Sequence, residues 1–86
     1  MVVKKVVFDC NDSFELKAIA VLIQKASSFR SSIWLNCDSR RANAKSLLGV
    51  MSLRIENGME IEVTTEGSDA EEALNTVVNY LSNPVF

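Results

Sequence analysis

The stretch VVKKVVFDCNDSFELKAIAVLIQKA, residues 2–26, changes its hydrophobic period once, and that change points to the fold class. Residues 2–8 alternate and are rich in β-branched valine, which is typical of a β-strand. Loop-type residues follow at 9–13, where Asp12 and Glu15 match the capping-box pattern of a helix start. From there apolar residues recur at helical spacing: Leu16, Ile19, Ala20, Ile23 and Ala26. The chain therefore begins with a strand and an amphipathic helix whose apolar stripe should face a core.

The middle of the chain predicts a hairpin and a short helix. Residues 32–36 alternate, with Trp34 on the face opposite Ile33 and Leu35, and the turn at 38–39 leads into a strand over 40–44. Ser46 precedes the almost wholly apolar run 47–53, so we expect a two-turn helix with Ser46 as its N-cap. A two-turn helix on a sheet cannot bury every side, so Leu47, Leu48 and Met51 should form an exposed apolar patch, which usually marks an interaction site.

The last third predicts a strand and a helix. Asn57-Gly58 marks a tight turn, and residues 59–65 alternate with Ile61 and Val63 inward. Asp69 and Glu72 form a second capping-box pattern before the apolar stripe Ala73, Leu74, Val77, Val78 and Leu81. The order strand, helix, strand, strand, helix, strand, helix predicts an α+β sandwich of a sheet under helices, in one domain covering residues 1–86.

Composition excludes several classes of function. The 86 residues contain no histidine, so there is no imidazole base, nucleophile or metal ligand, and the net charge of −2 gives no reason to bind nucleic acid or an anionic membrane. Cys10 and Cys37 are too far apart for a redox or zinc motif and are expected to be reduced thiols. Apolar runs are too short to span a bilayer, and the amino terminus lacks a signal-peptide pattern, so a cytoplasmic location is expected.

Several strings resemble HPr, the phosphocarrier family of the bacterial sugar phosphotransferase system. The strongest is residues 43–53, NAKSLLGVMSL, which is similar to the regulatory-serine segment of HPr proteins from Gram-positive bacteria. Residues 26–29, ASSF, and 66–73, EGSDAEEA, support it, and the similarity runs nearly end to end. The resemblance implies an open-faced β-α-β-β-α-β-α sandwich, in which three helices cover one face of a four-stranded antiparallel sheet.

The family's phosphocarrier loop is where this chain departs from the pattern. HPr proteins usually carry Gly-Leu-His-Thr-Arg-Pro-Ala-Ala there, whereas residues 13–20 read SFELKAIA. Glu15 stands at the histidine position, Lys17 at the arginine and Ala18 at the proline, and Ala20 is kept. A phosphocarrier needs a nucleophilic nitrogen that passes its phosphoryl group on readily; Glu15 could in principle form an acyl phosphate, but nothing near it in the sequence indicates that it does. This places the chain closer in type to Crh, the HPr-like regulator that lacks the histidine and keeps the serine.

The resemblance therefore implies a non-enzymatic regulatory phosphoprotein without cofactor or metal. Phosphorylation at Ser46 would be the switch, Lys45 would supply positive charge beside the phosphate, and Leu47, Leu48 and Met51 would anchor partners, with Glu15, Lys17 and Ala20 at the edge of that surface. The implied partners are proteins: a serine kinase/phosphorylase, a catabolite-control transcription regulator, and enzyme I and enzyme II components. No direct nucleic-acid or membrane contact is expected.

Structural readings of the same residues stay open beside the functional ones. Ser46 is equally an N-cap hydroxyl, and Glu15 equally a first-turn carboxylate that the helix dipole favours, rather than a partial mimic of phosphohistidine. Two other functions remain: a phosphoryl carrier that uses an atypical residue, and an interaction module that has lost phosphorylation. A face of the sheet bearing Trp34 with Val3 or Val7 would expose apolar surface that favours association, so homodimerisation through it is a further hypothesis.

Overall fold

The computed structural model describes residues 1–10 and 15–84. The elements are β1 (Val2–Val7), α1 (Glu15–Ser27), β2 (Ser32–Cys37), β3 (Arg40–Asn43), α2 (Leu47–Ser52), β4 (Glu60–Glu66) and α3 (Ala70–Ser82). The predicted order is confirmed, and five predicted strand boundaries shift by one residue: the ends of β1, β2 and β3 and both ends of β4. The Phe8 N–H still donates to the Met59 carbonyl, opposite it in the β1–β4 register, but the Asp9 N–H turns away to the Leu81 carbonyl of α3.

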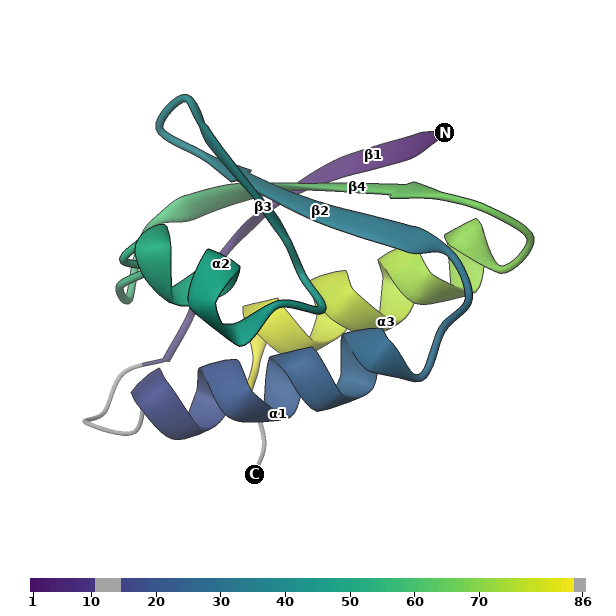
Figure 1. Cartoon of the computed structure of the whole chain (residues 1–86). Helices are drawn as coiled ribbons and strands as arrows, with labels where there is room; N and C mark the ends of the chain where they lie inside the picture. Colours follow the sequence, from purple (N-terminus) through teal and green to yellow (C-terminus); the bar gives the residue numbers. More distant parts are fainter. Residues whose placement is uncertain (11–14, 85–86) are drawn as a thin grey trace.

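The strands form one antiparallel sheet in the order β1-β4-β2-β3. All the helices lie on one side of it, with α1 and α3 side by side and α2 beneath the β3 end of the sheet (Figure 1). No helix of the described residues lies on the other face of the sheet. This arrangement is the predicted open-faced sandwich.

The core lies between the sheet and the helices. Register places Leu35 between Val63 and Ala42, and all three are buried, as are Ile33 and Ile61. Alternation along β2 and β4 therefore turns Ile33, Leu35, Ile61 and Val63 inward as predicted, whereas the open face is partly exposed and Thr64 on it is buried. The apolar stripe predicted for α3 is buried throughout.

The stripe predicted for α1 is partly wrong. Leu16 is 62% exposed and Ala20 is also exposed, whereas Ala18, Ile19, Leu22 and Ala26 are buried. Apolar residues also occur outside the predicted stripe, at Ala18, Val21 and Leu22, so hydrophobic period alone could not decide which stripe turns inward. Packing against α3 decides it: the Tyr80 hydroxyl donates to the Ala18 carbonyl at 2.9 Å, which fixes the Ala18 side of α1 against the core.

The two predicted capping boxes have different outcomes. Residues 11–14 and the Glu15 side chain lie outside the described residues, and the predicted Asp12–Glu15 capping box lies there too. The Asp69–Glu72 box is wrong. Asp69 is the N-cap of α3, but its carboxylate makes no cap bond and instead accepts hydrogen bonds from the backbone N–H groups of Arg30 and Ser31.

Candidate functional site

Ser46 occupies the position that the sequence predicts for it. It is the N-cap of α2, with extended backbone, and its Oγ accepts a hydrogen bond from the Gly49 N–H at 3.2 Å. Its carbonyl accepts from the Val50 N–H at 2.9 Å, so the first turn of the helix is closed around it. The residue is only partly buried. The hydroxyl therefore stabilises the helix start and stays within reach of solvent.

Helix α2 has one buried side and one exposed side. Val50 is fully buried and Leu53, which follows the helix, is 5% exposed. On the other side Leu47 is 46%, Leu48 82% and Met51 44% exposed. We call these three residues the α2 apolar face. Large apolar side chains gathered on one surface of a small protein usually mark an interaction site.

The first turns of α1 also carry exposed residues. Leu16, Lys17 and Ala20 are exposed, and α1 packs directly on α2. Sequence reasoning placed Leu16 in the core and so missed it as a surface residue. The available signal was the near-continuous apolar character of 18–23, which supplies enough inward residues without Leu16.

Lys45 lies beside Ser46 in the chain, but its ammonium group has a partner elsewhere. Nζ donates to the Phe29 carbonyl at 2.7 Å, just after the C-terminal end of α1. The Lys45 N–H donates to the Asn43 side-chain oxygen at 2.9 Å. In this state Lys45 ties the loop before α2 to the end of α1, and a positive group at a helix C-terminus is electrostatically favourable.

The α1–β2 loop beneath that contact is held from its other side by Asp69. Its carboxylate accepts from the Arg30 N–H at 3.0 Å, from the Ser31 N–H at 2.9 Å and from the Ser31 hydroxyl. The Ser31 hydroxyl, followed by the Arg30 N–H, lowers the pKa of Asp69 to about 2. Gly67 makes the close approach possible, because a Cβ there would lie 2.8 Å from the Ser31 Cα. Sequence reasoning missed this contact, which joins residues far apart in the chain.

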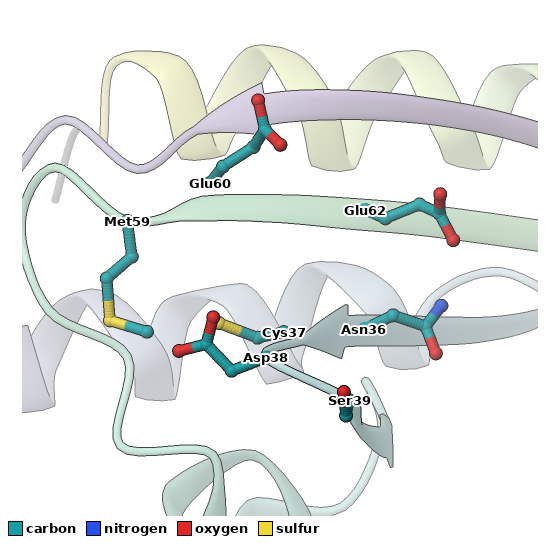
Figure 2. Close-up of a pocket in the computed structure, with 7 residues that line it drawn as sticks. All are labelled: Asn36, Cys37, Asp38, Ser39, Met59, Glu60 and Glu62. Atoms are coloured by element: carbon teal, nitrogen blue, oxygen red, sulfur yellow. The ribbon is translucent and has the colours of Figure 1, made fainter.

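A separate hollow of about 330 Å³ lies at the β2–β3 hairpin end of the sheet, and Figure 2 shows its lining: Asn36, Cys37, Asp38, Ser39, Met59, Glu60 and Glu62. Three of these residues are carboxylates and none is a cation. Burial, followed by the charge of Asp38, raises the pKa of the Cys37 thiol, which disfavours the reactive thiolate. Within residues 1–10 and 15–84, no three potential ligands gather as a metal site would require. Cys10 and Cys37 are both buried, and no disulfide joins them.

The two arginines of the β2–β3 hairpin also contact other parts of the fold. The Arg41 guanidinium lies 4.5 Å from the centre of the Trp34 ring, on the face opposite Ile33 and Leu35. This contact leaves Trp34 half-buried on the open face. Arg40 donates to the Ser52 carbonyl at the end of α2, at 3.2 Å. None of the helices in the described ranges is long and apolar enough to cross a bilayer.

Comparison with known proteins places these features in a family. Residues 2–83 match the family model described as "PTS HPr component phosphorylation site". The HPr-like protein Crh of Halalkalibacterium halodurans is 35% identical over 81 residues, covering 94% of this chain and 96% of that protein.

Comparison with solved structures shows the same family relationship. A crystal structure of the phosphocarrier protein HPr from Bacillus anthracis superposes with a TM-score of 0.89 at 40% identity, covering 93% of this chain and 95% of the other. A crystal structure of Crh from Bacillus subtilis, described as a domain-swapped intertwined dimer, superposes with a TM-score of 0.76 at 32% identity. The match covers 100% of this chain and 99% of the other. Family match, full-length identity and shared fold together show that the chain belongs to the HPr family as a Crh-like member.

Proposed function

We propose that this chain is a non-catalytic regulatory phosphoprotein of the phosphotransferase system and carbon catabolite control, switched by phosphorylation at Ser46. The observation that carries the proposal is the placement of Ser46. A partly exposed hydroxyl stands at the start of a helix whose next residues, Leu47, Leu48 and Met51, are exposed and apolar. One surface thus combines an acceptor for a phosphoryl group with an anchor for a protein.

The reaction at Ser46 would be transfer from ATP by a serine kinase. Oγ attacks the γ-phosphorus, a new O–P bond forms, the bond to the ADP oxygen breaks, and the hydroxyl proton passes to a base of the kinase. The phosphorylated Ser46 side chain carries about −1.5 to −2 charges. That charge lies at a helix N-terminus, where the macrodipole favours anions, so the modification is compatible with the existing helix. Its effect would be on the surface that partners meet.

The missing histidine supports a regulatory role over a carrier role. Glu15 stands where the family carries the phosphorylated histidine, and the whole sequence has no imidazole to replace it. The partners of the proposed switch are a serine kinase/phosphorylase and a catabolite-control regulator. The α2 apolar face with Lys17 and Ala20 would be the surface they contact.

The test is incubation of the purified protein with HPr serine kinase and ATP, read by intact mass and phosphate-affinity gel. We expect one added phosphoryl group, lost in Ser46→Ala and kept in Ser52→Ala, a matched serine on the same helix. A second incubation with phosphoenolpyruvate and enzyme I should leave the protein unmodified. An unmodified protein in the kinase reaction would overturn the proposal, and label from phosphoenolpyruvate would favour the carrier alternative.

A homodimer is also proposed, through the face of the sheet that the helices leave open. Val3 and Val7 are 49% and 51% exposed on that face, which they share with Trp34. The Crh structure from Bacillus subtilis is also a dimer, described as domain-swapped. Sedimentation over a wide concentration range should show dimer formation that Val3→Lys weakens, and a monomer at high concentration would exclude it.

A further inference from the structure

Arg54 has a backbone conformation that arginine does not favour. It directly follows Leu53, the C-cap of α2, and has φ of 53°, in the left-handed region. Its N–H donates to the Met51 carbonyl at 3.1 Å, which closes the end of the helix. Glycine is the usual residue at this position because it has no Cβ to clash with the backbone. The local structure therefore does not explain why an arginine stands here.

Side-chain contacts do not explain it either. The other cations around α2 each contact the fold: Lys45 the Phe29 carbonyl, Arg40 the Ser52 carbonyl and Arg41 the Trp34 ring. Arg54 is exposed, and in the described part of the chain its guanidinium has no hydrogen bond, ion pair or ring contact. It borders an open hollow of about 450 Å³ lined also by Asp38, Arg40, Leu53, Glu56 and Met59. The guanidinium is thus available to a partner.

The position of Arg54 connects it to the proposed docking surface. It lies three residues after Met51, the last member of the α2 apolar face, and α2 itself has only six residues. At 1.5 Å per residue the helix is about 9 Å long, so both ends fit easily beneath one protein partner. A typical partner covers about 800 Å² of surface. An enzyme that reaches Ser46 across the α2 apolar face therefore also comes close to Arg54.

We propose that Arg54 is a specificity-determining residue of this surface, which pairs with a carboxylate of the serine kinase that docks over α2 to reach Ser46. This inference rests on the proposed function. The guanidinium offers a planar pair of N–H donors that matches a carboxylate, and a charge pair at the edge of an interface acts on association rate and selectivity. Arg54 contributes to binding of the kinase and not to the transfer step.

The test is the variant Arg54→Gly, since glycine suits the left-handed conformation and the protein should stay folded. With HPr serine kinase and ATP, we expect the KM for the protein to rise at least fivefold at low salt, with kcat within twofold of the parent value. The difference should shrink at high salt because screening weakens an exposed charge pair. Arg54→Lys should recover part of the affinity. Urea unfolding should show Arg54→Gly to be at least as stable as the parent.

Ser39→Gly is the matched control, because Ser39 also has a positive φ, of 67°, but lies at the β2–β3 turn. It should leave the KM unchanged. An unchanged KM in Arg54→Gly, or an equal rise in Ser39→Gly, would overturn the role of Arg54 while phosphorylation at Ser46 still upheld the proposed function. A parent chain that is not phosphorylated at all would overturn the proposed function and the inference together.

Discussion

Replacing either of two leucines near α2 by alanine should separate binding from stability. Leu48 is 82% exposed and Leu53 is 5% exposed, although the same three side-chain carbons are removed at each position. Complete burial of a leucine side chain is worth about 1.5–3 kcal/mol, and Leu48 gains only about a fifth of that in the fold. Leu48→Ala should therefore lower the free energy of unfolding by about 0.5 kcal/mol or less. Leu53→Ala leaves a cavity and should lower it by about 2–5 kcal/mol.

The binding effects should have the opposite order. Truncation of a side chain that anchors an interface commonly costs about 1 kcal/mol or more, which corresponds to about a fivefold rise in KM. We expect that rise with HPr serine kinase for Leu48→Ala, with little change in kcat. Leu53→Ala, assayed where it is still folded, should keep the parent KM.

Urea unfolding followed by circular dichroism measures the first quantity, and initial rates of phosphorylation measure the second. A stability loss above about 1.5 kcal/mol in Leu48→Ala would refute the assignment of this residue to the surface, since so large a loss requires burial. A parent-like KM in the same variant would refute the use of the α2 apolar face in docking.

Three further predictions concern the contacts that hold the fold. Gly67→Ala combines a positive φ with a clash against the Ser31 backbone and should lower the free energy of unfolding by about 2–4 kcal/mol; Gly58→Ala, with positive φ and nothing within 4 Å, should lower it by only about 1–2 kcal/mol in the same urea titration. Because the folded-state pKa of Asp69 is lowered from 3.8 to about 2, its contribution to stability is present above pH 3.8 and is lost as the pH falls toward 2, so thermal melts of Asp69→Asn should show a flatter acid limb than the parent. Tyr80→Phe removes a buried hydrogen bond to α1 and should lower the melting temperature by an amount equivalent to about 1 kcal/mol; an unchanged melt would mean that the bond does not contribute.

The part of the site that the sequence predicts depends on contacts between near neighbours. Ser46 caps α2 through a residue three positions on, and the short apolar run after it must leave some side chains exposed. Both conclusions need only local geometry and residue type. The resemblance to the HPr family likewise rests on contiguous strings. The strand and helix order came from the hydrophobic periods along the chain, and the structure has that order.

By itself the sequence determined the alternation of strands and helices, the inward face of β2 and β4, and the absence of any imidazole. Only the tertiary structure decided which side of α1 is buried. Leu16 is exposed because Tyr80 of α3 packs against the Ala18 side of the helix. It also turned Asp69 away from its own helix and Lys45 toward Phe29. The physical reason is the same in each case. A side chain that could make several local contacts adopts the arrangement in which it also contacts a segment distant in sequence. The hydrophobic period along the chain carries no information about which distant segment that is.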